Sequence, residues 1–294
     1  KTLRKNFAGS RKKPGVVLVI NPRKGKKPRK DNWVAYGKFL AKKGEELTVD
    51  YTLSSSSGSA LQPLTYQYST KTETSEINTN SDIYNSNLQV NWVLPFDNGS
   101  KLETGVHSIV RGNDSEYYFF NSSGGAKIED LSQRNLFTYN EQIHAGYGLW
   151  SGQFNEISVQ TGLRIEKTYI DGKQGSGSDK ISQNYFNFYP SLSFSYPINE
   201  NNQLQLSYSR TIKRPSARMI NPFIDRSNLE VFRSGNPDLK PEYVNSIELG
   251  FNGNWDKTNL GFTAFYKHIA NPINTIILLD EAGISHMSPQ NMSS

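Results

Sequence analysis

The sequence predicts an all-β protein, an antiparallel meander of about eight to ten strands that forms part of a transmembrane β-barrel. Three observations support this fold class. Apolar and polar residues alternate over runs of about ten residues, as at 156–167 and 202–212, and a period of two is typical of strands with one apolar and one polar face. Short polar turns alternate with long loops, and aromatic residues gather beside the short turns.

The alternating runs follow one another along the chain. They lie at 47–53, 88–94, 143–149, 157–165, 186–196, 204–212, 247–251 and 260–266. Short turns are expected at 95–101, 150–155, 197–202 and 254–259, and long loops rich in Gly, Ser, Asn and Asp at about 54–80, 112–134, 168–184 and 213–243. Residues 66–69 and 116–121 are candidates for short β extensions inside these loops. Residues 32–43 are the best candidate for a helix.

Two architectures fit this pattern, a soluble β-sandwich or lipocalin-like barrel and a membrane barrel. Strands of about ten residues are long enough to cross a bilayer with tilt, and outer-membrane barrels have short periplasmic turns and long outer loops. Tyr and Trp favour the lipid–water interface. The expected interface aromatics are Trp92, Phe96, Trp150, Phe154, Tyr196 and Trp255. These features favour the membrane barrel, with outer-membrane lipid as a partner and the outer membrane of a Gram-negative bacterium as its location.

The charge of the chain is divided between two parts. Of 33 Lys and Arg and 27 Asp and Glu, twelve basic residues and no acid lie in residues 1–30, so the remainder carries 21 basic against 27 acidic residues. The overall charge of +6 therefore combines a head of +12 with a body of −6. Only 35% of residues are hydrophobic and no cysteine is present, which fits a wet barrel interior and excludes disulfide scaffolds and thiolate metal sites.

We divide the chain into a basic head, residues 1–38, and a partial barrel domain, residues 39–294. Clustered cations could bind nucleic acid, but the head has no base-stacking pattern, so no nucleic-acid partner is expected. The alternatives are a solvated irregular tail and a segment that is not native coding sequence. Pro14, Pro22 and Pro28 argue against a helix in this head.

Residues 185–254 contain several distinctive short sequence motifs. The motif residues are Arg214, Pro215, Asn221, Pro222, Phe223, Gly235, Asn236, Pro237, Asp238, Leu239, Lys240, Pro241 and Glu242. Pro237 and Pro241 fix φ and favour extended neighbours, so the motif is interpreted as a rigid loop leading into a strand. These motifs resemble those in the barrel of TonB-dependent outer-membrane receptors, especially the Bacteroidota-type outer-membrane β-barrel group. The resemblance covers the chain from about Phe39 onward.

The resemblance implies a transporter that binds and imports a scarce nutrient, such as a metal chelate or a glycan. It also implies a TonB energy-transducing complex that acts through a plug, which we do not find in this sequence. Because the resembling barrels have more strands than we count, we expect this chain to be a piece of a longer receptor. The alternative functions are a surface adhesin and a soluble β-rich binding protein.

Candidate ligand contacts are the arginines of the predicted polar faces and outer loops. They are Arg164, Arg210, Arg214, Arg218, Arg226 and Arg233, which could attract an anionic ligand or lipid phosphates. The four histidines share no metal-ligand spacing, and the glycine-rich loop at 172–177 lacks the Lys-Ser/Thr pair of a phosphate-binding loop. We therefore expect no enzyme, no catalytic residues, no metal and no cofactor.

Overall fold

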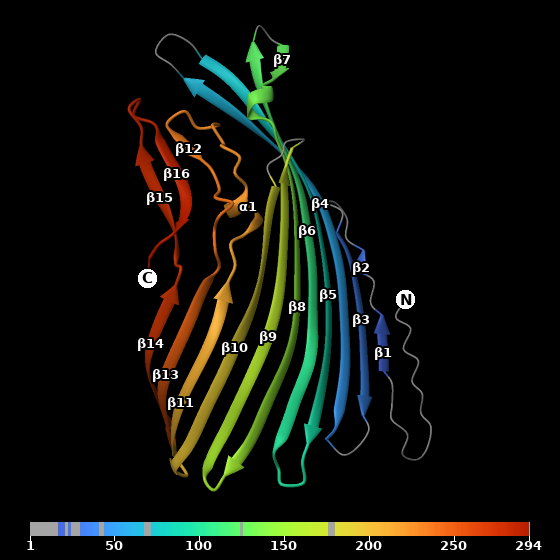
Figure 1. Ribbon diagram of the computed structural model, residues 1–294, viewed down its shortest axis with the longest axis vertical. Helices are drawn as coiled ribbons and strands as arrows, with labels where there is room; N and C mark the ends of the chain where they lie inside the picture. Colours follow the sequence, from blue (N-terminus) through green and yellow to red (C-terminus); the bar gives the residue numbers. More distant parts are fainter. Residues whose placement is uncertain are drawn as a thin grey trace.

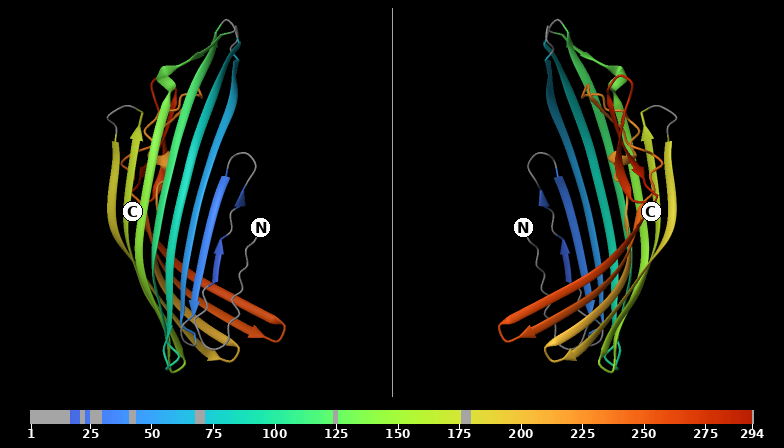
Figure 2. Two further views of the ribbon diagram at one scale, coloured as in Figure 1. Left: turned by 90° about the vertical axis from the view of Figure 1, so that its right-hand side faces the viewer. Right: turned by 90° about the vertical axis from the view of Figure 1, so that its left-hand side faces the viewer.

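The protein is a curved antiparallel meander sheet whose central strands, β4–β6 and β8–β10, are the longest (Figure 1 and Figure 2). The computed structural model describes residues 17–20, 23–24, 30–40, 44–67, 72–123, 126–175 and 180–293. The main sheet follows the order β1-β3-β4-β5-β6-β8-β9-β10-β11-β13-β14, with β2 beside β3 and β7 beside β6. A small sheet, β12-β16-β15, stands above the ends of β11, β13 and β14 (Figure 1).

The bounds of the strands show how far each extends. They are β1 Val17–Ile20, β2 Arg23–Lys24, β3 Lys30–Leu40, β4 Glu46–Gln67, β5 Thr72–Pro95, β6 Lys101–Ser123, β7 Ala126–Glu129, β8 Asn135–Phe154, β9 Ile157–Gln174, β10 Lys180–Asn199, β11 Asn202–Lys213, β12 Val231–Arg233, β13 Glu242–Trp255, β14 Thr258–Ala270, β15 Ile273–Leu279 and β16 Ser285–Asn291. Ten of these have 11 or more residues, so the predicted fold class and the expected number of long strands are confirmed.

The two faces of the sheet differ in chemistry. We call the face that carries Leu88, Val106 and Ile165 the outer face, and the opposite one the inner face. Register pairs join Leu88 to Ser108, Ser108 to His144, and His144 to Lys167, so these residues form one row across the outer face. On the side of this row toward the short turns the outer face is largely apolar, and on the other side it is mostly polar.

The predicted long loops at 54–80, 112–134 and 168–184 are wrong in large part. β4 and β5 pair continuously from Glu46↔Val93 to Gln67↔Thr72, and β6 follows β5 as far as Ser122. The outer face of these extensions is mostly polar, so the sequence shows little apolar alternation there. The ladder continues because each backbone group still finds its partner on the neighbouring strand.

The described part of the head is strand. β3 begins at Lys30 and pairs with β4 from Lys30↔Ser56 to Leu40↔Glu46. The expected boundary at residue 38 therefore falls inside a strand, and residues 32–40 of the helix candidate at 32–43 are strand, while 41–43 lie outside the described residues. β1 and β2 also pair with β3, which corrects the prediction of an irregular head for these residues. Residues 1–16, 21–22 and 25–29 of the predicted head lie outside the described residues.

The long connection between β11 and β13 is the predicted loop that remains. It contains β12 and a four-residue helix, α1, Ala217–Ile220, and no helix in the described ranges is long and apolar enough to cross a membrane. Ile220 and Leu239 of this connection pack against the inner face of β8, β9 and β10. The buried cluster they form contains Phe137, Tyr139, Ile170, Ile181, Ile220 and Leu239.

Candidate ligand-binding face

A buried carboxylate on the inner face holds two arginines that the chain brings from different elements. Glu166 Oε2 accepts a hydrogen bond from Arg164 Nη2 at 2.8 Å, and Glu166 Oε1 forms an ion pair with Arg214 Nη2. The Glu166 side chain is 4% exposed. Thr168, fully buried beside it, accepts from Arg214 Nη2 at 3.3 Å.

Strand alternation explains this arrangement. Arg164, Glu166 and Thr168 are two residues apart on β9, so all three face inward. Arg214 lies just beyond the end of β11 and reaches Glu166 from the connection to β13. A second ion pair joins β6 and β8. Arg111 Nε of β6 is 3.3 Å from Oε2 of Glu141 on β8, which is also a buried carboxylate.

The cluster of Arg111, Glu141, Arg164, Glu166 and Arg214 has three positive and two negative charges. Around it lie buried polar atoms without hydrogen-bond partners in the described part of the chain, among them Asn187 Nδ2, Tyr189 OH, Arg210 Nε and Arg214 Nε. All four can donate a hydrogen bond. Because buried polar groups are normally satisfied, this face is chemically suited to an anionic ligand rich in acceptor atoms.

The structure brings together only some of the predicted arginines. Arg164 and Arg214 meet at Glu166, and Arg210 lies over the ring of Tyr243 at 5.1 Å. The other three lie in the connection between β11 and β13. Arg218 is exposed on α1, Arg226 lies over the ring of Phe232 at 5.6 Å, and the backbone of Arg233 pairs with that of Asp225.

Sequence reasoning missed the acidic partners Glu141 and Glu166. Both lie on strands, at inward-facing positions that alternate with outward-facing residues. For Glu166 the available signal is Arg164, two residues earlier on the same face of the strand. Glu141 has no such local signal, because its partner Arg111 lies on β6. Thr168 lies in the segment predicted as a loop, at 168–184. Asn187 and Tyr189 lie in the run at 186–196, where the apolar residues define the predicted strand.

The motif around Gly235 ties the connection to three elements. Asn236 Nδ2 donates to the Pro289 carbonyl on β16 at 3.2 Å, and its backbone N–H donates to the Met219 carbonyl of α1 at 2.7 Å. Gln183 of β10 donates to the carbonyls of Pro237 and Leu239 at 2.9 and 3.1 Å.

The rest of the motif fixes the start of β13. Lys240 N–H donates to Asn291 Oδ1, and Asn291 Nδ2 donates back to the Lys240 carbonyl. Buried Glu242 accepts from the N–H of Ile273 and pairs with Lys213 at 3.1 Å. The motif residues Pro215 and Pro241 are buried, Asp238 is exposed, and Asn221 and Pro222 are half-buried.

The connection also reaches β4 and β6. Tyr66 of β4 donates to the Ser227 carbonyl at 2.6 Å, and Tyr117 of β6 packs on Phe223 with ring centroids 5.2 Å apart. Burial under this contact, with Asp225 nearby, raises the pKa of Tyr117. The connection therefore covers the inner face above the charged cluster.

Comparison with known proteins identifies the family. The sequence profile described as the outer membrane protein beta-barrel family matches residues 38–294. The chain belongs to the outer membrane protein beta-barrel family. Its place is therefore the outer membrane of a Gram-negative bacterium. No curated protein matches the chain in sequence.

Solved structures with the same fold include three transport proteins. The chain aligns with the ferric citrate transporter FecA in its unliganded form (TM-score 0.57, 12% identity, 83% of this chain and 35% of that one). It also aligns with the ferric yersiniabactin uptake receptor FyuA from Yersinia pestis (0.55, 13%, 83% and 36%) and the copper transporter OprC (0.54, 10%, 90% and 48%). The chain thus spans less than half the length of each of these proteins.

In an outer membrane protein beta-barrel, the outer face is the surface that meets lipid. On β8 the row at His144 and the aromatic Phe154 are ten residues apart, a length that crosses a bilayer with tilt. Trp92, Trp150, Tyr196 and Trp255 also lie on the outer face near the short turns, and Phe96 lies in one of these turns. These places fit the predicted aromatic girdle, which remains a prediction.

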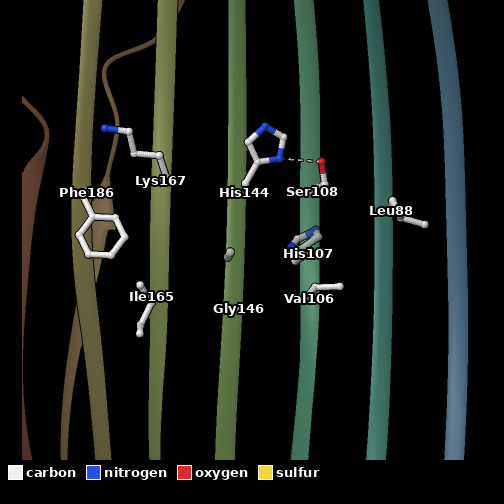
Figure 3. A pocket seen from close by; sticks show the side chains of 10 residues that line it. Leu88, Val106, His107, Ser108, His144, Gly146, Ile165, Lys167 and Phe186 are labelled. Carbon is white, nitrogen blue, oxygen red and sulfur yellow. Dashed lines mark hydrogen bonds between the residues drawn. The ribbon is translucent and has the colours of Figure 1, made fainter.

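A shallow groove lies on the outer face along β8 (Figure 3). Val106 and Leu88 border it on one side, and Ile165 and Phe186 on the other. Gly146 forms its floor, and His144 stands at its polar end with Nδ1 2.9 Å from Ser108 Oγ. The groove belongs to the lipid-facing surface and is separate from the charged cluster on the inner face.

Proposed function

We propose that the chain forms part of the barrel wall of a TonB-dependent receptor, which binds a scarce nutrient and imports it across the outer membrane. Family membership and the fold shared with FecA, FyuA and OprC support this proposal. The observation that carries it is the arginine-rich cluster around Glu166 on the inner face. The cluster carries three positive charges against two negative ones and leaves donors of Asn187 and Tyr189 without partners in the described residues, beyond what attaching the connection to the wall requires.

The ligand that suits this cluster is a small anion with several acceptor oxygens, such as a metal chelate. Its carboxylate or phenolate groups would compete with Glu166 for Arg164 and Arg214. Arginine favours such groups because its planar guanidinium donates two parallel hydrogen bonds. The unpartnered donors of Asn187 and Tyr189 lie beside this position and would complete the contacts.

Transport in this proposal needs partners outside the chain. A plug would close the barrel, and the TonB complex would move it to release the ligand. The protein then acts by binding and release, without a catalytic residue or a cofactor. Membership in an outer-membrane family sets the soluble alternative aside, and a surface adhesin would show no energy-dependent uptake.

The test is uptake by cells that carry the complete receptor. We expect deletion of the coding sequence to abolish TonB-dependent uptake of one nutrient, screened with radioactive iron as ferric citrate, with copper, with haem and with oligosaccharides. Arg164→Ala together with Arg214→Ala should lower that uptake severalfold while surface expression is unchanged. A deletion strain that grows like the parent strain when each nutrient is limiting would contradict import.

The control for total charge compares Arg164→Ala alone with a variant that removes one positive charge elsewhere. Lys257 is exposed in a short turn at the other end of the strands, so Lys257→Ala should leave uptake unchanged. If Lys257→Ala lowered uptake as much as Arg164→Ala, the effect would be one of total charge. The inner-face cluster would then have no special role.

A further inference from the structure

The row that divides the outer face contains one positively charged group, Lys167, and the imidazole of His144, at the level of the lipid headgroups. Phe186, Lys167, His144 and Ser108 are register partners on β10, β9, β8 and β6 (Figure 3). The face changes from apolar to mostly polar at this row. Lys167 therefore lies where the headgroups of the outer leaflet meet the protein.

Three lysines on this part of the outer face have no carboxylate partner in the described residues. Lys167 Nζ donates to Asn184 Oδ1 at 3.1 Å and lies 5.2 Å from the ring centre of Tyr169. Lys173 and Lys180 are direct register partners, and like charges in that position destabilise a strand pair. By contrast, four other lysines form ion pairs: Lys38, Lys101, Lys127 and Lys213.

The acidic residues of the same face do not neutralise these lysines. Asp171 lies between Lys167 and Lys173 on β9 and makes no ion pair within the described ranges. Asp82, Asp114 and Glu116 lie on β5 and β6, and β8 separates them from β9. The outer face of β9 and β10 therefore keeps a surplus of positive charge next to anionic lipid.

The groove beside Lys167 can receive an acyl chain. It has a volume of about 390 Å³ and runs along β8 between apolar side chains of β6 and β9. Gly146 and Gly148 both face outward there, and a Cβ at Gly148 would meet nothing within 4 Å. The polar end of the groove, at His144 and Lys167, is at the headgroup level.

We infer that the outer face of β8, β9 and β10 is a binding site for a phosphorylated glycolipid of the outer leaflet. One acyl chain lies in the groove over Gly146, one phosphate lies at Lys167 and His144, and further phosphates or acidic sugars lie at Lys173 and Lys180. Lys167 and Lys173 are six residues apart on β9, about 20 Å along the strand. A single phospholipid headgroup is too short to reach both, whereas a phosphorylated oligosaccharide headgroup is long enough.

The experiment titrates the purified full-length protein in detergent with lipopolysaccharide, phosphatidylglycerol or phosphatidylethanolamine and counts bound lipids by native mass spectrometry. We expect lipopolysaccharide to bind most tightly. Replacing Lys167, Lys173 and Lys180 together by Gln should weaken that binding by roughly tenfold or more, since each cation at a membrane surface adds to affinity for anionic lipid. Lys257→Gln is the control for Lys180→Gln, since each removes one exposed positive charge, and it should bind like the unmodified protein.

A second variant tests the groove without changing the charge. A side chain at Gly146 has only the Gly105 carbonyl oxygen near its Cβ, at 4.0 Å, so Gly146→Leu should fold, fill the groove and weaken lipopolysaccharide binding. Should the triple lysine variant misfold, as judged by heat-modifiable migration, Lys180→Gln at an exposed position serves instead. Unchanged lipopolysaccharide affinity in the lysine variants would overturn the site. Phosphatidylglycerol binding as tight as lipopolysaccharide binding would overturn its assignment to a glycolipid.

Discussion

Glu166 joins two parts of the chain that are far apart in sequence. Arg164 comes from the same strand, and Arg214 comes from the connection that follows β11. Because the carboxylate is buried, each arginine loses a favourable partner if the carboxylate is removed, and the desolvation of both remains. The residue therefore both shapes the candidate ligand site and fixes the connection to the wall.

The first prediction concerns this carboxylate. Glu166→Gln should lower the free energy of unfolding by about 3 kcal/mol, the usual cost of breaking a buried ion pair. Urea unfolding in detergent, followed by tryptophan fluorescence, measures it. Glu46, which pairs with Lys38 and is 32% exposed, provides the control, because Glu46→Gln should cost less than about 1 kcal/mol. Equal costs at the two positions would show that burial of Glu166 contributes nothing.

A second prediction concerns Gly235. A Cβ there would lie 2.6 Å from the Met219 carbonyl oxygen and 2.9 Å from that of Arg218, with the Asn221 carbonyl oxygen still closer. Backbone cannot move aside easily, so Gly235→Ala should destabilise the protein by about 1–3 kcal/mol and expose the connection to protease. Gly58→Ala is the control, because nothing lies within 4 Å of a Cβ there. Equal protease resistance in both variants would contradict the prediction.

At the scale of elements, the sequence predicted the strands where one face meets lipid. The runs 157–165 and 204–212 alternate cleanly, and both lie in strands, β9 and β11. The upper part of β4, with four consecutive serines from Ser54 to Ser57, has no apolar face. Only its pairing with β5 makes it a strand, and pairing between distant segments is not visible in local periodicity.

The candidate site was predicted less completely than the strands, because it too depends on contacts between distant segments. The sequence marks Arg164 and Arg214 as basic residues of a polar face and a loop, and their meeting at Glu166 depends on the path of the connection after β11. Nothing in the local sequence gives that path. The motif around Gly235 did indicate a rigid loop before a strand, but its contacts with β10 and β16 depend on tertiary structure.

The third prediction belongs to the β15–β16 hairpin. Asp280 accepts hydrogen bonds from His286 Nε2, Ile284 N–H and Ala282 N–H, each at 2.9 Å. The bond from His286, followed by those from the backbone, lowers the pKa of Asp280 below its usual 3.8. A carboxyl whose pKa is lowered on folding stabilises the fold above its unfolded pKa, and this stabilisation is lost as the pH falls through the folded pKa.

We therefore expect the hairpin to open as the pH falls from about 5 to below about 3.8. Hydrogen–deuterium exchange of residues 273–291, corrected for the intrinsic rate, should show falling protection over this range. In Asp280→Asn the protection should be lower at pH 5 and change little on acidification. A wild-type hairpin equally protected across the range would contradict the role of Asp280.

At the scale of the whole molecule, the lipid-facing band determines how the protein lies in the membrane. Trp92, Trp150 and Trp255 are near the short turns, whereas Trp33 of β3 is the register partner of Leu53, close to the opposite boundary. The described strands β1 and β14 end the main sheet and are not paired with each other. The curved sheet thus forms a sector of a barrel wall.

The fourth prediction tests this band. All four tryptophans should be quenched more by lipids brominated near the headgroup than by lipids brominated near the chain end, because tryptophan favours the interface. Variants with one tryptophan each, the others replaced by Phe, report the two boundaries separately. Strongest quenching by the deepest bromines would place the band elsewhere on the strands.

The long extensions of β4, β5 and β6 beyond the membrane determine which part of the chain lies farthest from the bilayer. From Leu53, near the membrane boundary, β4 continues to Gln67, which carries its end roughly 40 Å above the bilayer. Antibodies, bacteriophage and host proteases would therefore encounter the far ends of β4 and β5 before the membrane-spanning parts of these strands, so selection by predators and immune systems should fall first on them.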